Sequence, residues 1–225
     1  MSNTEAIETT TDADALFSDG LQWKWATPVM HVNLLHTGVM PQEFHRALQR
    51  FADGHEEALR QDPALLGSAS NAYIRYRTNV FSDATDETLI EMRERMNTLC
   101  DRYVAAVHGE DLPPHVRRTE MWFVLQHAND AAEAIHAHYH EGSDIAFVYY
   151  LNVPSDGSGQ LVFVDPRGSI GRGAFALPRH RLTTHVQPAE GDLLIFPRYL
   201  VHYTTTNTDT QTRRVIAGSV RYDKA

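Results

Sequence analysis

Apolar side chains recur at intervals of three and four in two stretches of the first half of the chain. The first stretch follows Pro41, and its apolar positions are Phe44, Leu48 and Phe51. The second follows the helix-capping sequence 83–87, and its apolar positions are Leu89, Met92, Met96, Leu99 and Tyr103. This repeat is that of an amphipathic helix with one buried face. The pattern predicts two long helices, over about residues 41–61 and 85–108.

The pattern changes after residue 114 to short apolar or alternating runs. The runs are separated by turn sequences rich in glycine and proline, and they lie at 121–125, 145–153, 160–164, 182–186, 192–196, 201–205 and 215–222. Short strands at intervals of about ten residues are typical of a sandwich, jelly roll or barrel. Two helices packed on one face of a two-sheet structure would bury the apolar faces of both. We therefore predict a mainly β fold with N-terminal helices and a β-rich core over about residues 115–225.

Composition and charge narrow the class of protein. Residues 1–20 are acidic and threonine-rich, so we expect a disordered segment followed by one domain over residues 21–225. A formal net charge of −9 argues against a nucleic-acid partner. The single cysteine, Cys100, excludes an internal disulfide framework and fits a reducing compartment. We expect a cytoplasmic protein, because no apolar run is long enough to span a membrane and the N-terminus does not resemble a signal peptide.

Three histidines at alternate positions, His136, His138 and His140, precede the apolar run 145–151. Every second side chain of a strand leaves by the same face, so all three imidazoles can point into one space. Imidazole suits iron, zinc, copper and nickel, which makes a metal site one interpretation. The other is a solvated strand face in a chain that has 13 histidines. His202 begins a later strand-like run and is a further candidate, since neighbouring strands of a roll can bring distant residues together.

Two adjacent arginines, Arg213 and Arg214, lie in the last predicted strand. A guanidinium group is costly to bury unless it meets an anion, and a bidentate pair with a carboxylate is its natural use. Strand alternation allows only one of the two arginines to face the interior, and it allows only one of Tyr149 and Tyr150 to do so.

Taken in order, these features resemble a known family. The matching pieces are Trp122, His138-Tyr-His140-Glu-Gly-Ser143, Val148-Tyr-Tyr-Leu151, Gly159 with Asp165-Pro166, Pro188-Ala-Glu-Gly-Asp192, Phe196-Pro-Arg-Tyr-Leu-Val-His202 and Arg214-Val-Ile-Ala. The set resembles the iron(II)- and 2-oxoglutarate-dependent oxygenases with the double-stranded β-helix fold (a jelly roll, cupin-like), in particular a group with a His-x-His pattern. The likeness extends over most of the chain after about residue 22, and the ordered set makes it specific.

The resemblance implies iron(II), 2-oxoglutarate and O2 as cofactor and co-substrates. It implies hydroxylation of an unactivated C–H bond in a small-molecule or amino-acid-like substrate, with succinate and CO2 as co-products. It also implies that His202 is the distal iron ligand, that Arg214 receives the far carboxylate of 2-oxoglutarate and that Tyr150 hydrogen-bonds the same carboxylate. A homodimer is left open, and neither nucleic acid nor a membrane is expected as a partner.

Many relatives complete the metal site with His-x-Asp or His-x-Glu, whereas the matching positions here are His138 and His140. The third ligand is then His140, a nearby carboxylate (Glu141 or Asp144), or absent. We predict a three-histidine site of His138, His140 and His202, because the first two lie two apart on one strand face, as the ligands of His-x-Asp do. A register slid by two would make His140 the proximal ligand and Gly142 the non-ligating residue, as in His-x-Gly iron halogenases.

Two other classes are compatible with part of the pattern. A cupin-like three-histidine dioxygenase that does not use 2-oxoglutarate would share the His-x-His pair, although residues 188–191 lie too far from His202 for its second motif. A sugar- or partner-binding jelly roll would leave the histidines and the arginine without a purpose. Succinate formation, or binding of 2-oxoglutarate, separates the oxygenase from both.

Overall fold

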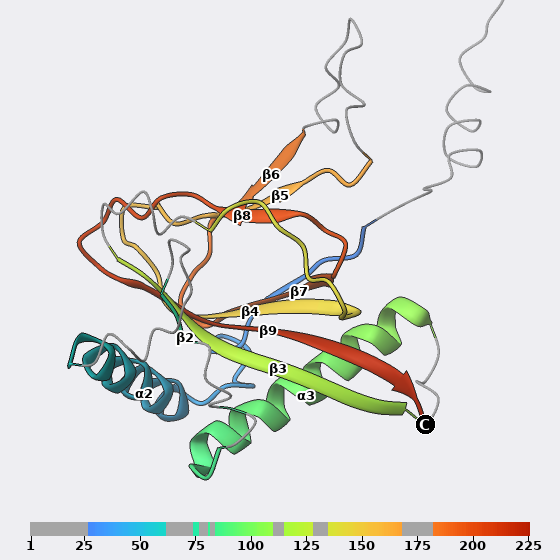
Figure 1. Cartoon of the computed structure of the whole chain (residues 1–225), viewed down its shortest axis with the longest axis horizontal. Coiled ribbons are helices and arrows are strands. Elements are labelled where there is room, and N and C mark those ends of the chain that lie inside the picture. Colours follow the sequence, from blue (N-terminus) through green and yellow to red (C-terminus); the bar gives the residue numbers. More distant parts are fainter. Residues whose placement is uncertain are drawn as a thin grey trace, which may run out of the picture.

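The computed structural model describes residues 27–61, 74–76, 81, 84–109, 115–127, 135–167 and 182–225. The segment expected to be disordered, residues 1–20, lies outside these residues. The described chain is layered, with two helices below a six-stranded sheet and a three-stranded sheet above it (Figure 1).

Both predicted helices are present, as α2 (Gln42–Gln61) and α3 (Glu87–His108). Asp86 caps α3, because its carboxylate accepts hydrogen bonds from two backbone N–H groups of the first turn. Gly109 ends the helix in the left-handed conformation, with φ at 78°. Neither helix is apolar enough along its length to cross a membrane.

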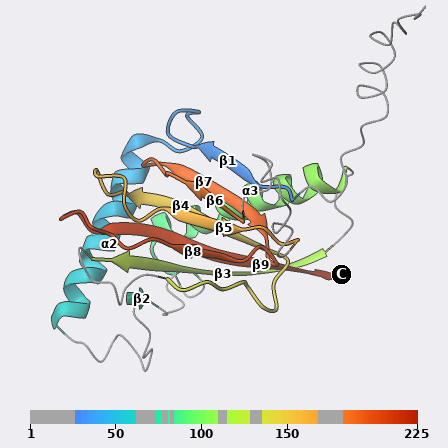
Figure 2. The same ribbon diagram turned by 90° about the horizontal axis from the view of Figure 1, so that it is seen from above.

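The strands of the larger sheet follow the order β1-β7-β4-β9-β3-β2, and those of the smaller sheet follow β6-β5-β8 (Figure 2). All of these pairs are antiparallel. The strands are β1 (Met30–Asn33), β2 (Ile74–Tyr76), β3 (His115–Gln126), β4 (Ile145–Asn152), β5 (Leu161–Val164), β6 (Thr183–Val186), β7 (Asp192–Pro197), β8 (His202–Thr204) and β9 (Arg213–Lys224).

The central strands of the larger sheet bury both of their faces. On β4, Phe147 and Tyr149 join the core between the sheet and the helices, while Val148 and Tyr150 join the core between the two sheets. Side chains alternate between the two faces of a strand, so each central strand contributes to both cores. The mainly β fold with two supporting helices is confirmed, and the space between the sheets holds the three predicted histidines and Tyr150.

Candidate metal centre

The smaller sheet brings the histidines together. The backbone N–H of His138 donates to the carbonyl of His202 at 3.0 Å, and the N–H of His202 donates back to His138 at 2.9 Å. This bridge places residues 135–140 antiparallel to β8, with His140 N–H donating to the carbonyl of Arg198 at 3.2 Å. His136 is exposed and is not part of the cluster.

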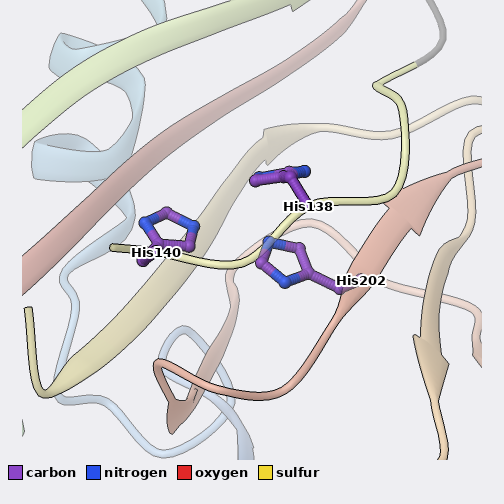
Figure 3. Close-up of side chains that lie close together, drawn as sticks. All are labelled: His138, His140 and His202. Atoms are coloured by element: carbon purple, nitrogen blue, oxygen red, sulfur yellow. The ribbon is translucent and has the colours of Figure 1, made fainter. Parts of the chain in front are cut away.

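Each of His138, His140 and His202 offers one ring nitrogen, and these atoms all lie within 4.8 Å of one another (Figure 3). The ring centroids of His138 and His202 are 4.3 Å apart, and that of His140 lies 5.2 Å from His202 and 5.4 Å from His138. Metal–nitrogen bonds of about 2 Å require this kind of convergence.

Two of the rings are oriented in the same way by their own backbone. The Nδ1–H of His138 donates to the carbonyl of His136 at 2.8 Å, and the Nδ1–H of His202 donates to the carbonyl of Leu200 at 2.9 Å. Because a carbonyl only accepts, the proton lies on Nδ1 and Nε2 is the nitrogen that can bind a metal. The third ring, His140, stacks on Trp122 with 6.1 Å between centroids and 20° between planes.

Burial, followed by the charge of neighbouring His138, lowers the pKa of His202 to about 3. The residue is 6% exposed, and its ring stays neutral near neutral pH. Neutral imidazole is the form that coordinates a metal.

None of the carboxylates in the described residues joins the three histidines. Asp144, a candidate in the sequence, accepts a hydrogen bond from the backbone N–H of Tyr222 at 2.8 Å instead. Glu141 is exposed on the rim of the cavity beside the cluster. The donor set that the described residues offer is three imidazoles, which suits iron among other transition metals.

A cavity of about 330 Å³ opens beside the histidines, within the size range of small-molecule sites. One wall is the β3·β9 ladder, in which Trp122 faces Ala217 and Val124 faces Val215. This wall ends at Arg213, which is 1% exposed, and opens at Glu120, which is exposed.

Arg213, and not Arg214, faces this cavity. Arg214 points to the helix side, where its Nη2 donates to Glu56 of α2 at 2.7 Å and lies 3.3 Å from Asp53. The predicted register of the last strand, with Arg214 inside, is therefore off by one. The physical reason is that α2 supplies carboxylates for Arg214, which the strand pattern alone does not reveal.

Arg213 has no carboxylate partner among the described residues. Its Nη2 donates to the hydroxyl of Tyr150 at 3.4 Å, and its guanidinium carbon lies 5.2 Å from the centre of that ring. Its Nε and Nη1 are buried without a hydrogen-bond partner in the described part of the chain. A buried guanidinium in this state fits an incoming carboxylate.

Of the two adjacent tyrosines, Tyr150 lies between the sheets as predicted, and Tyr149 lies on the helix side. The hydroxyl of Tyr149 is 2.6 Å from Nδ1 of the buried His45. Burial raises the pKa of Tyr150, so its hydroxyl keeps the proton that it can donate to an anion.

Comparison with known proteins adds to this geometry. A family model described as "Putative 2OG-Fe(II) oxygenase" matches residues 120–218, which contain the histidines, Arg213 and Tyr150. The part of the chain that holds the candidate site thus matches the 2OG-Fe(II) oxygenases. A comparison with curated protein sequences found no match.

Solved structures of similar fold include a carbocyclase, a prolyl-4-hydroxylase and AviO1. The carbocyclase SnoK from nogalamycin biosynthesis, described as non-heme and alpha-ketoglutarate-dependent, is 12% identical with a TM-score of 0.58, over 100% of this chain and 88% of that one. AviO1 from Streptomyces viridochromogenes Tue57 is 17% identical with a TM-score of 0.54, over 82% and 86%. A prolyl-4-hydroxylase from Pseudomonas putida is 16% identical with a TM-score of 0.53, over 89% and 94%. These likenesses show the double-stranded β-helix fold.

The matched family implies iron(II) and 2-oxoglutarate, with O2 and a small-molecule substrate as further partners. The three imidazoles fit the metal, and the guanidinium of Arg213, which has no carboxylate partner in the described part of the chain, fits a dicarboxylate.

Proposed function

We propose that this protein is a 2OG-Fe(II) oxygenase that hydroxylates an unactivated C–H bond of a small-molecule or amino-acid-like substrate, with succinate and CO2 as co-products. The observation that carries the proposal is the buried Arg213, which lines the same cavity as His138, His140 and His202. A metal site alone would fit many reactions. A metal site with an unpartnered cation at the far end of its cavity favours a co-substrate that is a chelating keto acid with a second carboxylate.

In this proposal His138, His140 and His202 hold the iron. Arg213 and the hydroxyl of Tyr150 receive the far carboxylate of 2-oxoglutarate, in place of the Arg214 expected from the sequence. Iron(II) with 2-oxoglutarate and O2 supplies the oxidant that removes hydrogen from the C–H bond.

An apolar part of the cavity wall limits the access of water to the site in this proposal. Trp122, Val124 and Val215 form an apolar stretch between Arg213 and the open end of the β3·β9 ladder. Apolar walls strengthen the pairing of Arg213 with a carboxylate, because they lower the local dielectric constant. The substrate enters in this view from the open end, where Glu120 lies.

The halogenase register is the weaker alternative. It leaves His138 without a role, yet His138 and His202 form the shortest ring-to-ring distance of the three pairs. It also needs Gly142 beside the metal, whereas Gly142 has φ 80°, as in a tight turn. A cupin-like dioxygenase that does not use 2-oxoglutarate would leave Arg213 buried and unpartnered.

The proposal includes a cytoplasmic, reducing setting. Such a setting suits the single cysteine, Cys100, which is 0% exposed and whose pKa is raised by burial, and it suits a site for ferrous iron.

The test is metal and co-substrate binding under anaerobic conditions. We expect His138→Ala and His202→Ala to lose iron(II) binding and succinate formation, because water does not replace a neutral imidazole at equal affinity. His136→Ala is the matched control, since this exposed histidine lies two residues from His138. Full succinate formation by His138→Ala, or a chlorinated product when chloride is supplied, would contradict the three-histidine hydroxylase.

A further inference from the structure

Two buried polar residues oppose each other in the β3·β9 ladder, and one of them, Arg213, lines the cavity. Gln126 ends β3 and Arg213 begins β9, and they are direct partners in the antiparallel ladder. Val124 and Val215 belong to the core between the two sheets. Gln126 lies two positions from Val124 and Arg213 lies two positions from Val215, so both point to the same side. Directly opposite residues of an antiparallel pair have Cβ atoms about 5 Å apart. Gln126 is 0% exposed and Arg213 is 1% exposed.

Both side chains retain hydrogen-bonding atoms that no described residue satisfies. Gln126 donates its Nε2 to the carbonyl of Thr205 at 3.0 Å, which leaves its Oε1 buried and unpartnered. The Nε and Nη1 atoms of Arg213 are also buried without a hydrogen-bond partner among the described residues. A polar atom that is buried without a partner destabilises the fold, because its hydration is lost and not replaced. An unused acceptor opposite two unused donors indicates a site that is completed when a ligand binds.

The two adjacent arginines differ in the charge of their neighbours. Arg214 meets the carboxylates of Glu56 and Asp53. Arg213 forms no ion pair among the described residues; it donates to the hydroxyl of Tyr150, and its partner in the ladder, Gln126, is neutral. A carboxylate at the position of Gln126 would pair with Arg213 permanently. A neutral amide leaves the charge of Arg213 available to the carboxylate of a ligand.

We infer that Gln126 is a positioning residue for the co-substrate. The hydrogen bond to Thr205 fixes the amide, and its Oε1 accepts one N–H of Arg213 when the ligand is bound. The remaining N–H groups of the guanidinium are then turned toward the ligand's carboxylate, without competition for the charge. This inference rests on the proposed function, in which Arg213 receives the far carboxylate of 2-oxoglutarate.

The decisive variant is Gln126→Glu, which changes charge and keeps the shape of the side chain. We expect 2-oxoglutarate to bind on the order of 100-fold more weakly to iron(II)-loaded Gln126→Glu, because the introduced carboxylate occupies the guanidinium. Gln126→Met removes the amide without adding charge, and we expect only a severalfold loss. Anaerobic calorimetric titration of the two loaded variants measures both. The melting temperature of Gln126→Glu is expected to be no lower than that of Gln126→Met, since a new ion pair replaces the lost amide contact.

Two controls separate this role from simple structural support. Gln211→Glu adds the same charge at an exposed position near the start of β9 and is expected to leave binding unchanged. Pyruvate, a 2-oxo acid without the far carboxylate, is expected to bind Gln126→Glu as it binds the wild type. Equal losses in Gln126→Glu and Gln126→Met would overturn the inference, as would an unfolded Gln126→Glu beside a folded Gln126→Met. A wild-type protein that does not bind 2-oxoglutarate would instead contradict the proposed function.

Discussion

At the scale of single residues, the site is defined by which polar atoms are already satisfied. His138 and His202 each use Nδ1 on a carbonyl two residues earlier, so their Nε2 atoms are the ones that can bind a metal. Arg213 and Arg214 are neighbours in the chain, yet Arg214 pairs with Glu56 and Arg213 has no carboxylate among the described residues. We therefore assign a structural role to one arginine and a binding role to the other.

This assignment predicts opposite effects for two alanine variants. Arg213→Ala is expected to weaken 2-oxoglutarate binding by about 2–5 kcal/mol, the value of a desolvated charge pair, with little loss of stability in the ligand-free protein. Arg214→Ala is expected to keep binding and to lower the free energy of unfolding by about 3 kcal/mol, because it leaves Glu56 buried and without its main partner. Titration calorimetry and urea unfolding measure the two effects. The reverse pattern would restore the register expected from the sequence.

The Glu56–Arg214 pair also predicts a pH dependence of stability. Burial raises the pKa of Glu56, but hydrogen bonding to and the charges of Arg214 and His127 outweigh burial and leave the pKa below its ordinary 4.5. A carboxyl whose pKa is lowered in the folded state stabilises that state fully above its unfolded pKa and loses the contribution as pH falls through the folded value. The stability gap between wild type and Arg214→Ala should therefore shrink below pH 4.5. Urea unfolding at several pH values measures the gap, and a gap that stays constant through this range would mean that the contribution of Arg214 does not depend on the ionised carboxylate of Glu56.

At the scale of secondary structure, hydrophobic periodicity predicts the orientation of an element that buries only one face. It fails for a strand that buries both faces. The helical repeat and the cap at Asp86 fix α3 almost to its ends, because only one face of a helix packs. On β4, residues 145–151 are all buried, so no polar alternation marks which side holds Tyr150. The start of β9 is similarly ambiguous. Its register depends on Glu56 of α2, which pairs with Arg214. The sequence does not show this pair, because the two residues are far apart in the chain.

The small residues of β9 are a second feature whose role the sequence does not show. Ala217 and Ser219 are in phase with Arg213 and leave room for the cavity. Gly218, in phase with Arg214, is small for another reason: a Cβ there would lie 2.3 Å from Cζ of Phe147 on the helix side. The sequence alone cannot distinguish a small residue that leaves space from one that is covered by a neighbouring ring.

The close approach at Gly218 predicts the effect of a single methyl group. Gly218→Ala is expected to destabilise the protein by about 1–3 kcal/mol or more, since the new Cβ would also lie 2.7 Å from the backbone oxygen of Glu120, which cannot move freely. Gly54→Ala is the control in α2, where nothing lies within 4 Å of the added Cβ, and it should stabilise by about 0.5–1 kcal/mol. Thermal unfolding compares them. A neutral Gly218→Ala would mean that β4 and β9 are less tightly packed than described.

At the scale of the whole molecule, the cavity joins two sheets that contribute different parts of the site. His202 begins β8 of the smaller sheet, and Arg213 begins β9 of the larger sheet. A co-substrate that chelates the metal at one end and pairs with Arg213 at the other would tie the two sheets together. Its binding is thus expected to depend on the metal and to stabilise the fold as a unit.

The last prediction follows from this linkage. At a 2-oxoglutarate concentration 100 times its dissociation constant, binding should add about 2.7 kcal/mol to the stability of the metal-loaded protein. For a chain of 225 residues this corresponds to a rise in melting temperature of about 5–10 °C. Without metal, 2-oxoglutarate should raise the melting temperature much less, because only the pairing with Arg213 is left. Arg213→Ala should retain the rise caused by iron(II) alone and lose the further rise caused by 2-oxoglutarate, measured anaerobically by differential scanning calorimetry. An equal rise with and without metal would show that 2-oxoglutarate binds without the histidines, which would separate the two halves of the site.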